Sequence, residues 1–209
     1  MSAPQVPARG ARLPRSARRA QLMGAAREIF VAQGYHAAAM DDIAERAGVS
    51  KPVLYQHFPG KRELYLALLQ EHTTELQQAV RAALVSTPDN KQRVAATLGA
   101  YFAFIDSESA AFRLVFESDL TADPQVREMV ENLTIGCARL FTQVIQEDTG
   151  LALPEAELLA VALAGMAQVT ARYWLQSGRR VPRESADHLI AQLAWRGIRG
   201  FPKNEPRVG

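Results

Sequence analysis

Apolar residues recur along this chain at every third or fourth position, the period of a helix, and they do not alternate with polar residues as in a strand. Residues 22–30 show this pattern, and Gly34 is expected to end the first helix. Comparable stretches between polar or Pro/Gly breaks span residues 62–85, 90–106, 125–148, 154–176 and 184–201, with a shorter one around 112–116. With two short helices within residues 40–58, the pattern predicts an all-α protein of about nine helices.

The first of the two short helices is predicted from residues 40–47. Ile43, Ala44 and Ala47 give it one apolar side, and two aspartates in its first turn suit the positive end of the helix dipole. Gly48 follows and can take the left-handed conformation that ends a helix. A second helix directly after such a turn makes a helix-turn-helix.

The second short helix carries the polar chemistry of this region. Ser50 is expected to cap it, and Pro52 falls in its first turn, where a missing N–H costs no hydrogen bond. Leu54 and Phe58 are four residues apart and should face inward. The side chains left facing outward are Lys51, Val53, Tyr55, Gln56 and His57. A helix with these groups and no acid can lie in a DNA major groove.

The net charge of the chain changes sign shortly after the predicted helix-turn-helix. Residues 1–62 have a balance of +6 and residues 63–209 a balance of −4, within a total of +2. Local positive charge attracts phosphate, so the first third is the expected contact with nucleic acid. We therefore expect a basic disordered arm at 1–15, a DNA-binding domain at 16–61, a helical body at 62–201 and a tail at 202–209. The arm either reaches DNA or is simply a solvated tail.

Other classes of protein find little support. The single Cys137 allows no internal disulfide, and no run of eighteen apolar residues or signal-like segment is present, so a cytoplasmic protein without a membrane span is expected. The four histidines make no i, i+4 pair, so no metal site is expected. No phosphate loop or nucleophile elbow points to an enzyme, and no cofactor is expected. A lipid-binding carrier remains an alternative.

The last two predicted helices point to a partner subunit. Residues 154–176 are apolar nearly all the way round, and such a helix must be covered on both sides. A regular seam with small residues follows in residues 184–201. The positions expected in a homodimer interface are Leu158, Ala162, Leu189, Leu193 and Gly197. The alternative is that this seam packs within one subunit. A dimer is favoured because two recognition helices lengthen the site, which would then be palindromic.

The residues around the helix-turn-helix resemble the amino-terminal domain of TetR-family transcriptional regulators. The resemblance rests on Gly34-Tyr35, Met40 to Ala44, Ala47 to Lys51, Leu54-Tyr55, His57-Phe58, Lys61 and Leu64. It implies a three-helix DNA-binding domain and a body that binds a small molecule and dimerises through its last two helices. It also implies phosphate contacts from Ser50, Tyr55, His57 and Lys61, and approach to base edges by Lys51, Pro52, Val53 and Gln56. Ala38 and Ala39 stand where the family usually has a hydroxyl that caps the next helix, and Asp41 is an alternative cap.

The body is similar to that of actinobacterial regulators of fatty-acid synthesis within this family, which sense long acyl-CoA esters. Residues that could line an elongated apolar cavity are Leu98, Phe102, Phe112, Phe116, Leu133, Phe141, Met166 and Tyr173. The alternative is that these residues are ordinary core.

The expected function is that of a sequence-specific regulator, by family default a repressor, whose affinity for a double-stranded operator is controlled by a small apolar effector. The helix over 62–85 would act as a lever that changes the spacing of two recognition helices, which must stay near ~34 Å. The ligand would lower DNA affinity only as far as it prefers the displaced state. A constitutive regulator or an activator without an effector remains an alternative.

Overall fold

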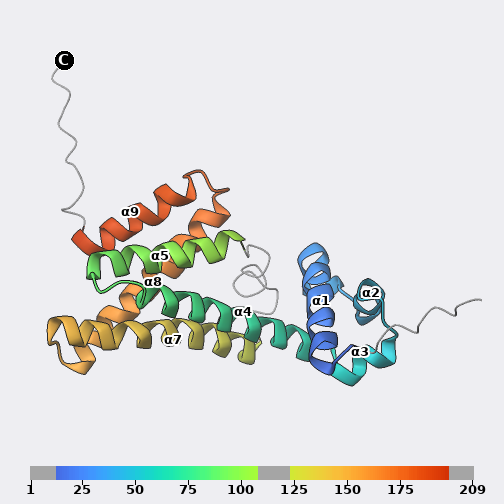
Figure 1. Cartoon of the computed structure of the whole chain (residues 1–209). Coiled ribbons are helices and arrows are strands. Elements are labelled where there is room, and N and C mark those ends of the chain that lie inside the picture. The colour runs from blue at the N-terminus through green and yellow to red at the C-terminus, as the bar shows by residue number, and fades with distance from the viewer. Residues whose placement is uncertain (1–12, 108–122, 198–209) are drawn as a thin grey trace, which may run out of the picture. The chain divides into compact units, whose positions relative to one another are not determined.

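The computed structural model describes residues 13–107 and 123–197, and every regular element within them is a helix. The helices are α1 (Arg15–Ala37), α2 (Met40–Arg46), α3 (Lys51–His57), α4 (Lys61–Leu84), α5 (Asn90–Ser107), α7 (Pro124–Thr149), α8 (Leu153–Gln176) and α9 (Arg183–Arg196) (Figure 1). The prediction of an all-α fold is confirmed. The short helix expected around Phe112 and Phe116 lies outside the described residues.

The chain divides into two compact units, residues 1–67 and 68–209. The division falls inside α4, between Ala67 and Leu68, whereas the sequence placed the boundary at the start of this helix. The helix-turn-helix therefore belongs to a unit that also contains α1 and the first turns of α4.

The core of the first unit is built from the apolar faces that the sequence indicated. Leu22 and Phe30 of α1, Ile43 of α2 and Leu54 of α3 are buried. Tyr65 of α4 packs edge-on against Phe30, with ring centroids 5.4 Å apart. Such an edge-to-face pair is a favoured aromatic geometry, and it fixes the first turns of α4 against α1.

Gly34 interrupts α1 instead of ending it. Its φ of 79° is left-handed, which glycine adopts without strain, and a last helical turn continues to Ala37. The chain thereby changes direction before α2 begins.

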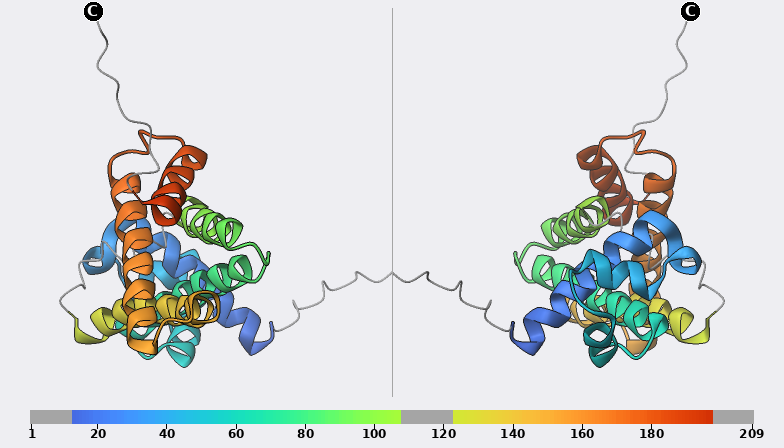
Figure 2. Two further views of the ribbon diagram at one scale, coloured as in Figure 1. Left: turned by 90° about the vertical axis from the view of Figure 1, so that its left-hand side faces the viewer. Right: turned by 90° about the vertical axis from the view of Figure 1, so that its right-hand side faces the viewer.

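The second unit is organised around α8, which packs on α7 and α5, while α9 lies beside α5 (Figures 1 and 2). One face of α8 is made of buried small residues at helical spacing, namely Ala156, Ala160, Ala164, Ala167 and Ala171. Small side chains let helix backbones approach closely. The alanine face of α8 can therefore be the buried face although its side chains are small.

The ends of α7 are defined by two ordinary caps. The Asp123 side chain accepts hydrogen bonds from the backbone N–H of Gln125 and Val126, at 2.8 and 3.4 Å. Gly150 ends the helix with a φ of 70°. By contrast, α9 is shorter than expected: it ends at Arg196, and Gly197 is the left-handed residue that closes it. Gly197 is therefore not part of the expected helical seam.

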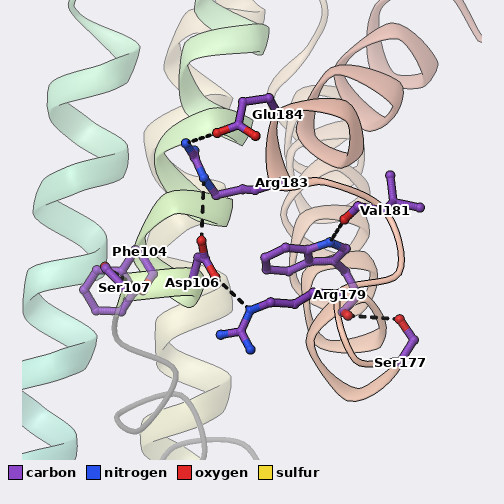
Figure 3. Close-up of polar contacts among 9 residues, drawn as sticks. Phe104, Asp106, Ser107, Ser177, Arg179, Val181, Arg183 and Glu184 are labelled. Carbon is purple, nitrogen blue, oxygen red and sulfur yellow. Dashed lines mark hydrogen bonds and ion pairs between the residues drawn. The ribbon is translucent and has the colours of Figure 1, made fainter.

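The connection between α8 and α9 is tied to the end of α5 (Figure 3). Asp106 accepts a hydrogen bond from Arg179 Nε at 2.8 Å and lies 3.7 Å from Arg183 Nε. On the other side of the connection, Trp174 Nε1 donates to the carbonyl of Val181 at 2.7 Å. These contacts fix where α9 begins relative to α8.

Among the described helices, α8 alone is long and apolar enough to cross a membrane by length and composition, with a mean hydropathy of 1.3 over its most apolar window. No such helix was expected from the sequence. Only 28% of that window is buried, so much of its apolar surface is free in the isolated chain.

Candidate nucleic-acid interface and effector cavity

The outer face of α3 is the best candidate for contact with DNA. Leu54 is fully buried and Phe58 is nearly so, which turns the opposite side of this short helix to solvent. The side chains exposed there are Ser50, Lys51, Pro52, Tyr55 and Gln56, while Val53 and His57 are half-buried. All the polar side chains expected on the outer face of α3 are therefore at least partly accessible to solvent. A short helix with such a face can enter a DNA groove.

The caps of these two short helices differ from expectation. Ser50 occupies the N-cap position of α3, but its side chain makes no capping hydrogen bond; its carbonyl accepts from Val53 N at 3.0 Å and Leu54 N at 3.3 Å. At α2 the N-cap is Ala39, again without a side-chain cap, and Asp41 does not replace it because its carboxylate is bonded elsewhere. The Ser50 hydroxyl thus remains available.

The position of α3 is fixed by side chains of α1. Gln21 Nε2 donates to the carbonyl of Ala47, at 2.8 Å, just before the glycine turn. The guanidinium of Arg19 lies over the ring of Phe58, 4.2 Å from its centroid, and Arg19 Nη1 donates to the carbonyl of His57 at 3.4 Å. Both ends of the helix-turn-helix are thereby held against the same helix.

Lys61 has a different environment from the one that the resemblance implied. Its Nζ donates to the carbonyls of Tyr35, His36 and Ala38, at 2.8, 3.1 and 2.8 Å. An ammonium group has three N–H donors, and all three are used here. The structure therefore gives Lys61 a structural role at the end of α1, and the phosphate contact that the resemblance implied for it stays a prediction.

Lys51 is also engaged. Its Nζ donates to Asp41 Oδ2 at 2.6 Å, and this hydrogen bond, together with the charge of Asp41, raises the pKa of Lys51. Because two N–H donors remain, Lys51 can still reach another acceptor. The sequence analysis considered Asp41 only as a cap of α2 and did not predict its contact with Lys51.

The second unit contains a partly open cavity of about 400 Å³. It is lined by residues of α4, α5, α7, α8 and α9, and most of its wall is aliphatic or aromatic. Polar groups gather where α5 begins and α7 ends: Arg93 donates to Asn90 Oδ1 at 3.0 Å and lies 3.7 Å from Asp148. A cavity of this size and character falls within the ~300–1,000 Å³ typical of small-molecule sites.

Half of the residues expected in such a cavity line it: Leu98, Leu133, Phe141 and Met166. Phe102 does not, because its buried ring packs against Trp174, with centroids 5.7 Å apart. Tyr173 does not either, since it is 71% exposed on the outer side of α8. Phe112 and Phe116 lie outside the described residues.

Sequence reasoning missed other parts of the wall, among them Val80, Tyr101, Leu163 and Trp195. Each sits on a helix whose apolar pattern was recognised, but the pattern does not say which apolar residues border empty space. The cavity also contains the thiol of Cys137, whose pKa is raised by burial to about 11.

The outer surface of α8 and α9 carries exposed apolar residues in an unusual number. We call this set, defined by Leu158, Leu159, Val161, Val169, Tyr173 and Leu189, the α8–α9 surface; each is at least 45% exposed. Of the residues expected at a dimer interface, Leu158, Ala162 and Leu189 are exposed and Leu193 is half-buried, while Gly197 is exposed at the end of α9. Large exposed apolar side chains gathered on two helices indicate an interaction site.

Comparison with known proteins identifies the family. Residues 22–68 match the model described as bacterial regulatory proteins, tetR family. Over 194 residues the chain is 48% identical to the HTH-type transcriptional activator FasR of Mycolicibacterium smegmatis, an alignment that covers 93% of this chain and 89% of that protein. The chain belongs to the TetR family.

Solved structures of transcriptional regulators share the fold. A TetR-like transcriptional regulator from Rhodococcus sp. RHA1 is 25% identical with a TM-score of 0.69, over 91% of this chain and all of that one. FadR from Bacillus subtilis, solved in complex with stearoyl-CoA, is 19% identical with a TM-score of 0.70, over 86% of this chain and 98% of that one. As a TetR-family member, the chain is a DNA-binding transcriptional regulator, and the helix-turn-helix prediction is confirmed.

Within the part of this TetR-family chain that the structure describes, no group of three or more His, Cys, Asp or Glu side chains could hold a metal ion. The described residues offer a polar recognition helix, an apolar cavity and exposed apolar side chains on α8 and α9.

Proposed function

We propose that this TetR-family protein is a cytoplasmic homodimer that binds a palindromic operator through α3 of each subunit and releases it when a long-chain acyl ligand fills the cavity of the second unit. The observation that carries the proposal is the cavity itself, because a body evolved only to dimerise has no need of about 400 Å³ of apolar space.

The lining of the cavity favours a largely apolar ligand that also carries a polar group. Leu98, Leu133, Phe141 and Met166 offer apolar contacts along it, whereas Arg93 and its partners offer hydrogen bonds at one end. An acyl chain with a polar headgroup combines these two properties. Since burying each CH₂ contributes about 0.8 kcal/mol, a long chain gains affinity steadily with the length that fits.

The names of related proteins agree with this ligand class and bear on the direction of regulation. The relative from Mycolicibacterium smegmatis is named a transcriptional activator, and the FadR structure from Bacillus subtilis contains stearoyl-CoA. Because this chain is 48% identical to that activator, we propose that it activates transcription, in place of the repression expected from the family default.

On the DNA side, the proposed contacts divide into two kinds. The proposed phosphate contacts are Ser50, Tyr55, His57 and Lys61. The proposed contacts to base edges are Lys51, Pro52, Val53 and Gln56. Gln56 is exposed and can pair with adenine through its amide, which both donates and accepts.

The α8–α9 surface is the proposed dimer contact. Leu158 and Tyr173 are each 71% exposed, and a second copy of the same surface would cover both. A second subunit on this surface also explains why α8 is long and apolar without placing it in a membrane.

Control would come from differential binding to two conformations. Two recognition helices can enter successive major grooves only when they are about 34 Å apart. Because α4 begins in the first unit and lines the cavity with Val80 and Leu84 near its other end, ligand binding can change that spacing. The ligand then shifts DNA affinity by the ratio of its affinities for the two conformations.

The test uses the full chain and a duplex that it selects from a random-sequence pool. We expect palmitoyl-CoA to raise the Kd for this duplex at least about tenfold in an anisotropy titration, and coenzyme A without the acyl chain to leave it unchanged. Met166→Trp, which fills the cavity, should keep DNA binding and lose the response to palmitoyl-CoA. Ile135→Trp is the matched control, because Ile135 is exposed on α7 and does not line the cavity, and it should respond as the wild type does.

Two results would contradict the proposal. If no duplex is selected, DNA recognition by this chain fails. If a duplex is selected but palmitoyl-CoA leaves its Kd unchanged at concentrations up to its solubility limit, the acyl ligand fails while DNA binding stands. For the direction of regulation, deletion of the gene should lower transcription next to the bound sites, and raised transcription would restore the expectation of a repressor.

A further inference from the structure

The ion pair between Asp41 and Lys51 lies within the proposed DNA-binding face. Asp41 is in the first turn of α2 and Lys51 is the first residue of α3, and Nζ and Oδ2 are 2.6 Å apart. The two side chains are 58% and 61% exposed. The pair therefore joins the two helices of the helix-turn-helix on the side that meets solvent.

The fold does not depend on this pair. Exposed ion pairs contribute little to stability, since solvent screens them and two long side chains lose freedom. The packing of Ile43 and Leu54, both fully buried, holds α2 against α3 without it. A carboxylate placed where a polyanion binds also costs affinity, so its presence calls for a role in binding.

We propose that Asp41 determines specificity: it holds Lys51 as a neutral pair, so that Lys51 adds to recognition of base edges and not to general attraction for phosphate. The inference rests on the proposed recognition of DNA by α3.

A free lysine and a paired lysine differ in the charge and in the number of N–H donors that they offer to DNA. A free lysine that neutralises one phosphate releases counterions from any duplex, which adds about 0.9 to the slope of log affinity against log salt. A lysine already paired with a carboxylate forms a neutral pair, so it does not neutralise a phosphate and does not add to the salt dependence. Its two remaining N–H donors can still meet O6 and N7 of a guanine, which are present only at the right base pair.

The first test compares Asp41→Asn with Asp42→Asn. Both variants remove one negative charge from the first turn of α2, but only the first one releases Lys51. Each protein is titrated, over a series of salt concentrations, with the duplex selected by the wild type and with a scrambled duplex of the same composition.

We expect Asp41→Asn to bind the scrambled duplex more tightly and with a steeper salt dependence, so that the ratio of the two affinities falls about tenfold. Asp42→Asn should change both affinities by a similar factor and keep the wild-type ratio. Asp41→Glu, which can keep the ion pair, should restore most of the ratio.

A second test asks whether Asp41 acts through Lys51. In a Lys51→Met background the ratio of affinities is lowered, and we expect Asp41→Asn to lower it no further. An undiminished further loss would show that Asp41 acts on DNA by itself and would overturn the inference.

The inference also fails if Asp41→Asn retains the wild-type ratio, or if Asp42→Asn lowers it equally. Circular dichroism and unfolding midpoints of the variants exclude loss of the fold as a cause. If the wild-type protein prefers no duplex, both the proposed function and this inference fail. If the wild type prefers the selected duplex and Asp41→Asn keeps the same preference, only this inference fails.

Discussion

Lys61 Nζ and the carbonyl of Ala38 are 2.8 Å apart, and this hydrogen bond is one of three that the lysine makes to the backbone at the end of α1. The first residue of α4 thus binds the segment that leads into α2. The same ammonium lies 4.6 Å from the centroid of the Tyr35 ring. Lys61 is therefore a structural cation of the DNA-binding unit.

Lys61→Met should destabilise the first unit, because three carbonyls lose a charged donor. Hydrogen bonds to charged groups contribute about 1.5–3 kcal/mol each at most, and water will satisfy part of what is lost, so we expect a loss of about 1–3 kcal/mol in the free energy of unfolding. Urea denaturation measures it. Lys91→Met removes an exposed lysine from the first turn of α5 and should change the free energy little. Equal stability of wild type and Lys61→Met would contradict this role.

The recognition helix offers a pair of variants with different expected effects. Tyr55→Phe removes a hydroxyl proposed to bind phosphate, so affinity for the selected and scrambled duplexes should fall by a similar factor. Gln56→Ala removes a proposed base contact, so affinity for the selected duplex alone should fall, by about tenfold. Anisotropy titrations of both proteins measure these ratios. Exchange of the two outcomes would show that phosphate and base contacts have been assigned the wrong way round.

The α8–α9 surface predicts the effect of one buried charge. Leu158→Glu places a carboxylate where Leu158 of each subunit would be covered, and desolvation of that charge should convert the dimer to a monomer at micromolar concentration. Sedimentation velocity measures the change. Val85→Glu is the matched control: Val85 is 75% exposed beyond the end of α4, so this variant should remain dimeric. A dimeric Leu158→Glu protein would place the interface elsewhere.

Cys137 provides a probe of the cavity. Burial raises its pKa from 9.0 to about 11, so at pH 8 the folded protein has about a hundredfold less thiolate than an unfolded chain. Labelling with Ellman's reagent should therefore be slow in the native protein, should accelerate as the pH rises toward 11, and should be fast in urea. Because Cys137 lines the cavity, palmitoyl-CoA should slow native labelling further. Fast labelling at pH 8 would show that the thiol is accessible and its pKa unshifted.

Local pattern was enough to predict the helix-turn-helix. The spacing of Leu54 and Phe58 determines which side of α3 is buried, and Gly48 has the left-handed φ of 65° that a cap of this kind requires. These features depend on residues within one turn of each other. The position of the ends was less certain, as the early end of α9 at Gly197 shows.

Contacts between distant residues were not predictable in the same way. Lys61 sits in an exposed-looking turn, and nothing in its neighbours indicates three carbonyls more than twenty residues away. Trp174 and Tyr173 are adjacent aromatic residues on a helix with little amphipathic contrast, yet one is buried and the other is 71% exposed. Where apolar residues surround a helix, its period cannot tell the inner face from the outer one.

The central claim is that two copies of α3, held at a fixed separation, read one duplex. Inserting five base pairs between the half-sites of the selected duplex turns one half-site by about half a helical turn, to the opposite face of the DNA. Anisotropy titration of the full chain should show a loss of affinity of about a hundredfold for the lengthened duplex. Equal affinity for the original and the five-base-pair insertion would contradict the claim, because it would mean that each α3 binds alone.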